Sequence, residues 1–451
     1  MNQIGYIFEF LDFSHVVRLS HVCTQFNILY NKYLTLRSNE WIIIQVDKYI
    51  SNGQIISAER LMRYYICLND ISGNRDNLRK RNKFAVDKLN NSPNNTINNK
   101  VISKYISLIC IYIWNSQLSN NRTHRTEIYK SFRSRVHSNI NNYNIYIPIN
   151  LYGGSISVEN TYIPTNKKFL CKHDKSKHNK SDIYIIASIF AYICVMDRQF
   201  KLAYDLINII TKNNSSICRK NKVYYLVKWQ LTQNNKYLKI FENSDFAFGM
   251  YLYGYMLYKT DSNGTHKFIS ILEQCLELDP TLIIALNSYI NLQSRIDLIM
   301  TSIESHPMYI PSYILSIKLL FDTSIWGNNT ILDKIDDFMS KNIYKYTMYT
   351  SNIKSDLEQF DGIKTLKHSS IFINIHRLLY LNTSIPNCKC YERRGNNSLI
   401  IENLVLLYRF YIRNDRMGNE AVNTLLYIQN NYNIDIHIKN YIYQQLQILT
   451  P

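Results

Sequence analysis

Two groups of Cys and His residues have the side-chain types that bind transition metals. Cys171, His173 and His178 lie close together in the sequence, and Cys388 stands two positions before Cys390. Thiolates and imidazoles are the usual ligands of structural zinc, but such sites combine two ligand pairs at characteristic spacings. Neither group has a second pair, so the sequence predicts no metal site and no bound cofactor.

Motifs that support catalysis are missing from the sequence. It contains no Walker loop, no Gly-x-Gly-x-x-Gly, no Gly-x-Ser-x-Gly and no His-Glu-x-x-His. These motifs supply phosphate cradles, activated nucleophiles and zinc-bound water. We therefore expect a binding protein rather than an enzyme.

The composition favours helices. Hydrophobic residues make up 46% of the 451 residues, whereas Gly and Pro number only 12 and 8. A sheet-rich chain of this size needs more turn residues than that.

The longest uncharged apolar stretch, from Ile183 to Met196, has 14 residues, while a membrane span needs about 20. The stretch predicts a buried helix, and we expect no membrane partner.

Positive charge is concentrated in one part of the chain. The formal net charge is +18, and residues 71–180 hold 19 Lys and Arg against 5 Asp and Glu, a balance of +14. Such a region suits phosphates, acidic membrane or an acidic protein, but a solvated loop is the favoured interpretation because no phosphate-binding motif accompanies the charge. Nucleic acid is therefore a possible partner, with Arg133 and Arg135 meeting phosphates. Five aromatic residues in this region could stack on bases, although helical spacing favours a core position for the first three: Tyr105, Tyr112, Trp114, Tyr129 and Phe132.

Cysteine usage indicates a reducing compartment. The nine cysteines are an odd number and follow no repeating spacing. The N-terminus reaches Glu9 and Asp12 before any long apolar run, which is not typical of a secretory signal. We expect an intracellular protein, either cytoplasmic or nuclear.

The first 45 residues predict a small helical unit. Apolar residues recur at helical spacing up to Leu11, and the stripe resumes at Val16 after a break around Asp12-Phe13-Ser14. Asp12 or Ser14 can cap the second helix, and Trp41 provides an anchor for a third segment. Forty residues bury too little surface to be stable alone, so we expect this unit to pack on a partner or on the rest of the chain.

The remaining chain divides into three segments by pattern. Residues 46–182 form a basic, Asn-rich region with one helix from about Val46 to Ile71, another from Val101 to Leu118, and an irregular linker from Asn141 to Asp182. Residues 183–345 contain helix pairs, and residues 346–451 form a C-terminal helical region. The clearest pairs span 187–215 and 250–280, and a weaker copy runs from Ile284 to Pro307. Pro280 and Pro307 each end the second helix of a pair, because proline lacks an N–H and cannot continue the helix.

The N-terminal pattern resembles an F-box motif. The match consists of Ile7-Phe8-Glu9-Phe10-Leu11-Asp12, then Val16 to Phe26, and then Trp41; the Leu-Pro pair that opens the family's motif is absent. The resemblance implies a helical unit that binds a Skp-type adaptor and, through it, a cullin-based ubiquitin ligase. The positions that it assigns to adaptor binding are Ile7, Phe8, Leu11, Val16, Leu19, Val22, Cys23 and Phe26.

The helix pairs resemble tetratricopeptide repeats. The matching positions are the small residues Ala191, Ala203 and Gly254 and the run Leu276-Glu277-Leu278-Asp279-Pro280. This resemblance implies an α-α superhelical array, in which stacked units of about 34 residues form a concave surface that holds another chain.

Together the two resemblances imply an all-α, non-catalytic substrate-recognition subunit of a cullin-type ubiquitin ligase. The F-box-like unit would bind the adaptor, and the helical repeats would bind an unknown target protein. The alternative is a tetratricopeptide-like scaffold without a ubiquitin role, associated with RNA through its basic region.

Overall fold

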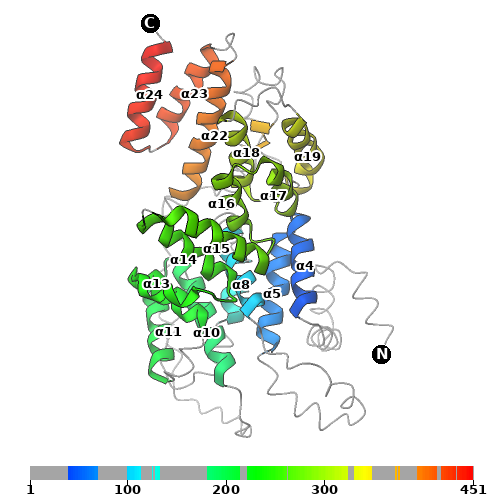
Figure 1. Ribbon diagram of the computed structural model, residues 1–451, viewed down its shortest axis with the longest axis vertical. Helices are drawn as coiled ribbons and strands as arrows, with labels where there is room; N and C mark the ends of the chain where they lie inside the picture. The colour runs from blue at the N-terminus through cyan, green and yellow to red at the C-terminus, as the bar shows by residue number, and fades with distance from the viewer. Residues whose placement is uncertain are drawn as a thin grey trace, which may run out of the picture. The chain divides into compact units, whose positions relative to one another are not determined.

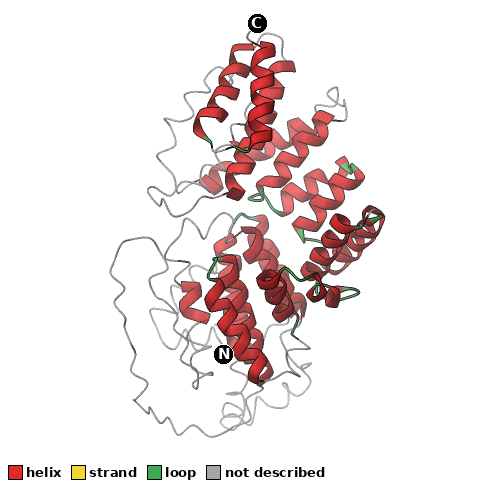
Figure 2. Ribbon diagram, turned by 90° about the vertical axis from the view of Figure 1, so that its left-hand side faces the viewer, coloured by secondary structure: helices red, strands yellow, loops and turns green. Residues whose placement is uncertain are grey.

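The structure, a computed structural model, describes residues 39–69, 99–112, 124, 127–132, 180–213, 221–261, 263–322, 330–347, 371–372, 374–375, 394–413, 418–432 and 434–449. The regular elements in these ranges are helices, and no strand occurs among them (Figure 2). The all-α class is therefore confirmed for this part of the chain. Of the F-box-like unit predicted over residues 1–45, only the part from Asn39 onward is described.

Contacts between residues divide the chain into two compact units. Unit 1 comprises Met1–Tyr49, Gln54–Trp114 and Asn121–Leu282, and unit 2 comprises Ile50–Gly53, Asn115–Asn120 and Ile283–Pro451. The four-segment division expected from the sequence remains a prediction.

Unit 1 is built from helices that are labelled in Figure 1. The helices are α4 (Asn39–Ser51, whose last two residues fall in unit 2), α5 (Ile55–Asn69), α8 (Asn99–Leu108), α10 (Lys180–Met196), α11 (Phe200–Asn213), α13 (Lys222–Thr232), α14 (Ala247–Thr260) and α15 (Gly264–Leu278). Two short 3₁₀ helices, η4 (Asn235–Tyr237) and η5 (Lys239–Phe241), join α13 to α14.

The region predicted as one helix from about Val46 to Ile71 contains a break. Helix α4 runs across the predicted boundary at residues 45 and 46, and α5 begins only at Ile55. Gly53 between them has φ 72°, a left-handed conformation that favours glycine. Because the apolar residues continue on both sides of Gly53, their pattern alone did not indicate the turn.

Helices α10 and α11 form a closely packed pair. Ala187, Ala191 and Ala203 are fully buried, as the sequence pattern predicted for a close helix contact. Arg198 takes the left-handed conformation that ends α10, and the N–H of Gln199 donates to the carbonyl of Cys194 at 2.7 Å. Helix α10 begins at Lys180, three residues before Ile183, because the apolar pattern starts only after its polar first turn.

Helices α14 and α15 form the second pair. A Cβ at Gly254 would lie 2.8 Å from Cγ2 of Ile271 and 2.9 Å from Cδ2 of Phe268, so only glycine permits this separation. Helix α15 ends at Leu278, with Asp279 as its C-cap and Pro280 following. Both pairs lie where the sequence predicted them, while the superhelical stacking of such pairs remains a prediction.

The aromatic residues of the basic region lie largely in the core of unit 1. Tyr105, Tyr112, Tyr129 and Phe132 are all buried. The rings of Phe132 and Phe190 of α10 stack with centroids 6.1 Å apart. The core position expected for Tyr105 and Tyr112 is confirmed, and Trp114 lies outside the described residues.

Unit 2 contains α16 (Ile283–Gln293), η6 (Ile296–Leu298), α17 (Ile299–Ser305), α18 (Ile310–Asp322), α19 (Thr330–Thr347), α22 (Arg394–Arg413), α23 (Gly418–Asn431) and α24 (Ile436–Leu449). Its first three α-helices are joined by a polar contact. The hydroxyl of Ser302 in α17 donates to Oδ1 of Asn287 in α16 at 2.7 Å, and Nδ2 of Asn287 donates to Oγ of Ser312 in α18 at 3.0 Å.

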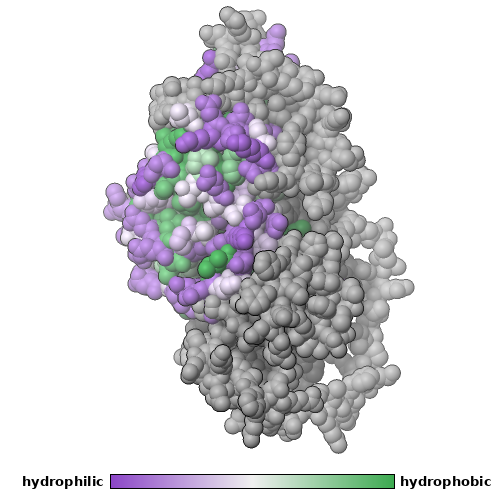
Figure 3. Space-filling model, turned by 90° about the vertical axis from the view of Figure 1, so that its right-hand side faces the viewer, coloured by the Kyte–Doolittle hydropathy of each residue, from purple (hydrophilic) through white to green (hydrophobic). Residues whose placement is uncertain are grey.

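The surface drawn in Figure 3 is predominantly polar where it is coloured, with apolar residues interspersed among hydrophilic ones. None of the described helices is both long enough and apolar enough to cross a membrane. The apolar run Ile183 to Met196 is instead part of α10, whose residues 186–195 are buried.

Candidate functional site

The predicted adaptor-binding residues, Ile7 to Phe26, lie outside the described residues. The same holds for Cys171, His173, His178, Cys388 and Cys390. Within the described ranges, no cluster of three or more His, Cys, Asp or Glu side chains is arranged to hold a metal ion. Two clusters of charged side chains, centred on α4, α5 and α8, lie within unit 1.

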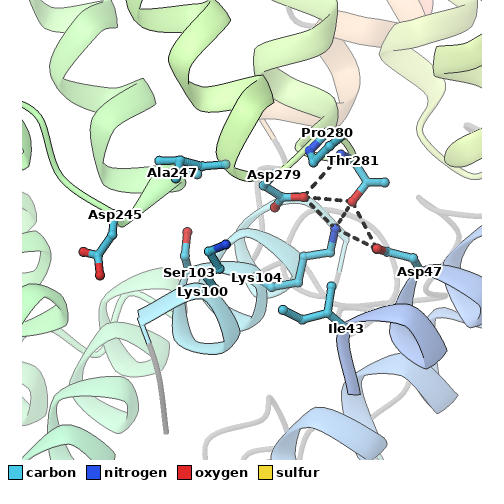
Figure 4. Close-up of a pocket in the computed structure, with 11 residues that line it drawn as sticks. Ile43, Asp47, Lys100, Ser103, Lys104, Asp245, Ala247, Asp279, Pro280 and Thr281 are labelled. Carbon is cyan, nitrogen blue, oxygen red and sulfur yellow. Dashed lines mark hydrogen bonds and ion pairs between the residues drawn. The ribbon is translucent and has the colours of Figure 1, made fainter. Parts of the chain in front are cut away.

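The first cluster surrounds Lys104 of α8, at a cavity of about 190 Å³. The Nζ atom of Lys104 lies 2.7 Å from Oδ1 of Asp47 in α4 and 3.2 Å from Oδ1 of Asp279 at the end of α15 (Figure 4). It also donates to Oγ1 of Thr281. The remaining lining residues are Ile43, Lys100, Ser103, Asp245, Ala247, Leu278 and Pro280. We call this group the Lys104 cavity.

Thr281 completes the connections within the Lys104 cavity. Its hydroxyl lies 3.1 Å from Oδ1 of Asp47 and 2.9 Å from Oδ1 of Asp279. Its backbone N–H donates to the same Asp279 oxygen at 3.2 Å, which fixes the turn after α15. The cluster therefore connects α4, α8 and the end of α15, which are far apart in the sequence.

Electrostatics keep Lys104 charged. Its side chain is only 4% exposed, and burial by itself disfavours the ammonium form. The charges of Asp279 and Asp47 outweigh that cost and raise the pKa of Lys104 above its ordinary value. Burial raises the pKa of Asp47; the charge of Lys104 lowers it, and the neighbouring carboxylate of Asp279 raises it again. A lysine held charged is a poor nucleophile and a poor base, so this arrangement suits a fixed connection between helices.

The second cluster surrounds Glu59 of α5, which is fully buried. Nε of Arg63 lies 3.0 Å from Oε1 of Glu59, and the hydroxyl of Tyr105 donates to the same oxygen at 2.8 Å. Arg63 also pairs with Glu127 at 2.8 Å, and Nε2 of His124 lies 3.0 Å from Oε2 of Glu59. We call this group the Glu59 cluster.

Opposite charges within the Glu59 cluster offset the cost of burying its ionised side chains. Burial opposes ionisation of Glu59, but Arg63 and His124 outweigh it and hold the pKa of Glu59 below its ordinary value. Burial also disfavours the imidazolium of His124, yet the adjacent carboxylates of Glu127 and Glu59 raise its pKa. Since Lys104 and Tyr105 are neighbours on α8, this one helix contributes to both clusters. The Glu59 cluster joins α5 and α8 to the short helical segment 127–132.

Sequence reasoning missed both clusters. The pair Glu59 and Arg63 has the i, i+4 spacing of a helical ion pair, and His124 and Glu127 are three residues apart, so these local signals were present. By contrast, Lys104 and Asp279 are 175 residues apart, and no local pattern predicts their contact.

The chain was also compared with known proteins. Neither protein-family models nor curated proteins nor solved structures yield a match.

Proposed function

We propose that the protein is a substrate-recognition subunit of a cullin-type ubiquitin ligase. In this proposal the F-box-like residues Ile7 to Phe26 bind a Skp-type adaptor, and the helical repeats from about residue 183 to 345 bind the target protein. The observation that carries the proposal is the match of residues 7–26 and Trp41 to the F-box pattern. Neither role requires a catalytic centre.

The connections of α4 support this proposal. Helix α4 begins at Asn39, soon after the F-box-like residues, and includes Trp41. Its Asp47 is joined to Lys104 of α8 and to Thr281 beyond α15. A ligase subunit must present its target at a defined position relative to its adaptor. A helix that follows the adaptor-binding residues and is fixed to the α14 and α15 pair meets this requirement.

Co-purification of the full-length chain with a Skp-type adaptor tests the proposal. We expect wild type to retain the adaptor, and we expect Leu11→Asp and Val22→Asp each to lose it, because a carboxylate in an apolar interface is costly to desolvate. Ile436→Asp serves as the matched control, because Ile436 in α24 is 63% exposed and far from the motif in sequence.

Failure of the wild-type chain to bind any Skp-type adaptor would overturn the proposal. So would equal binding by wild type and both motif variants. Circular dichroism of each variant separates loss of the interface from loss of the helical fold, because the described helices should keep their signal in the motif variants.

The second candidate function is a helical scaffold without a ubiquitin role, associated with RNA. The positive balance of residues 71–180 favours it. However, Tyr105, Tyr112, Tyr129 and Phe132 are buried and unavailable for stacking on bases. RNA contact by the described part of this region therefore depends on its Lys and Arg residues, and we expect such contact to depend strongly on salt.

A further inference from the structure

One face of the short helical segment 127–132 is bound to α5 by contacts that persist when the pH changes near neutrality. Nη2 of Arg63 lies 2.8 Å from Oε1 of Glu127, and Nη1 of Arg63 donates to Oγ of Ser131 at 2.6 Å. Burial opposes ionisation of Glu127, but His124 and Arg63 outweigh it and hold the pKa of Glu127 well below its ordinary value. Loss of the His124 proton at higher pH still leaves the charged Arg63 beside Glu127. This face therefore stays attached to α5.

The opposite face of the segment covers a stripe of α10. Phe190, Cys194 and Asp197 follow the i, i+4, i+7 spacing of one helical face, and all three are buried. The rings of Tyr129 and Phe190 meet edge to face with centroids 5.6 Å apart, and the Tyr129 hydroxyl donates to Oδ2 of Asp197 at 2.9 Å. Phe132 stacks on the same Phe190 ring. The segment therefore lies between this stripe and α5.

Asp197 is the member of the stripe whose charge can change near neutral pH. It is buried, and burial raises its pKa to about 8. If the segment moved away from α10, water would reach the carboxyl group and its pKa would return towards about 4. The closed segment therefore holds a proton that the open one releases, so rising pH favours opening.

Charged side chains on the helices around α10 have environments of their own. Those that follow Asp197 on α10 and α11 are exposed, and those described on α13 contact a carboxylate or a ring elsewhere: Arg198, Lys201 and Asp205 in the first set, Lys222 and Lys228 in the second. Tyr129 is the titratable side chain of the segment that contacts Asp197. Ionisation in the closed state therefore places a carboxylate against Tyr129 and away from water.

We propose that the segment 127–132 is a pH-sensitive latch, which is closed on α10 while Asp197 carries its proton and moves away from α10 as Asp197 ionises. The contacts of Arg63 with Glu127 and Ser131 form its hinge. Opening uncovers Phe190 and Cys194, so access to this side of α10 depends on pH. The latch goes beyond the proposed function and does not depend on the ligase role.

The size of the effect follows from the two protonation states of Asp197. With a pKa of about 8 when closed and about 4 when open, the ratio of open to closed protein rises about fifty-fold between pH 6 and pH 8. The Asn side chain cannot ionise, so Asp197→Asn should remove this rise.

Alkylation of the full-length protein by iodoacetamide at pH 6, 7 and 8, resolved by site with mass spectrometry, tests the latch. Cys194 is the reporter, because it is a free, fully buried thiol on the covered stripe. Cys275 is the internal control, because it is equally buried but its thiol contacts the Ala247 carbonyl of α14 instead. Dividing each rate by that of glutathione at the same pH removes the titration of the thiol itself.

We expect the normalised Cys194 rate of wild type to rise by at least about tenfold from pH 6 to pH 8, and to exceed the Cys275 rate by about tenfold or more at pH 8. Asp197→Asn should label slowly at Cys194 at every pH. Asp205→Asn is the matched control, because Asp205 is exposed on α11, and it should behave as wild type.

Three results would overturn the latch. A normalised Cys194 rate that does not change with pH in wild type would show that the segment stays closed. The same rise in Asp197→Asn would assign the pH dependence to another group. Equal rates at Cys194 and Cys275, both increasing with about 1 M urea, would show that unit 1 unfolds as a whole rather than opening at the segment.

Discussion

At the scale of single residues, Asp197 is the buried carboxyl group with the clearest consequence for stability. It lies at the end of α10, is 3% exposed, and accepts a hydrogen bond from the hydroxyl of Tyr129 at 2.9 Å. Burial raises its pKa to about 8. The folded protein therefore keeps a proton on Asp197 at pH values where the unfolded chain has lost it.

The sign of the resulting pH dependence follows from proton linkage. The stabilising contribution of Asp197 is complete below its ordinary pKa of about 4 and is lost as the pH rises towards about 8. The slope is at most about 1.4 kcal/mol per pH unit. We expect Asp197→Asn to remove this slope and to leave the protein more stable than wild type above neutral pH, because the amide cannot ionise.

Urea denaturation at several pH values between about 5 and 9 measures this effect. Asp205→Asn is the control, because Asp205 is exposed on the neighbouring α11. If the midpoints of wild type and Asp197→Asn changed in parallel with pH, Asp197 would be ionised in the folded protein and the prediction would be wrong.

At the scale of elements, Lys104 connects α8 to α4 and to the end of α15, so we expect its removal to destabilise unit 1. Lys104→Met leaves the carboxylates of Asp47 and Asp279 beside each other without their cation, and these side chains are only 27% and 15% exposed. Breaking a buried pair by removing one partner typically costs 3–5 kcal/mol. Since both carboxylates retain some contact with water, we expect a loss of about 3 kcal/mol in the free energy of unfolding.

Lys222→Met provides the matched comparison. Lys222 pairs with Asp245 at 2.9 Å, but the two side chains are 20% and 55% exposed, so the loss should be at most about 1 kcal/mol. Denaturant titration of both variants measures the difference. Equal losses would show that burial does not set the strength of the Lys104 connections.

Elements with a periodic pattern could be predicted from the sequence, whereas their tertiary connections could not. The small residues Ala187, Ala203 and Gly254 correctly indicated close helix contacts, because helix packing leaves a local periodic signal. The turn at Gly53 was missed because apolar residues continue across it. The contacts of Lys104 with Asp47 and Asp279 depend on which helices become neighbours, and the composition of α8 does not contain that information.

At the scale of the whole molecule, the net charge of +18 overstates the charge available to a partner. Of the Lys and Arg residues in the basic region, Lys104 is buried between carboxylates and therefore cannot meet a phosphate. The described aromatic residues of that region are buried as well. Within the described part of the basic region, exposed cations remain for a polyanion but exposed rings do not, which predicts binding by counterion release and little preference between bases.

Binding of labelled oligouridine and oligoadenosine to the full-length chain tests this expectation. We expect similar affinities for both, falling by at least about tenfold as salt rises from roughly 50 to 200 mM, because each phosphate contact releases condensed counterions. Heparin, which has no bases, should compete with either. A clear preference for one base would mean that rings stack on bases, and it would favour the RNA-associated scaffold over the ligase subunit. Affinity that is insensitive to salt would show that phosphate contacts do not drive binding, and it would count against the scaffold.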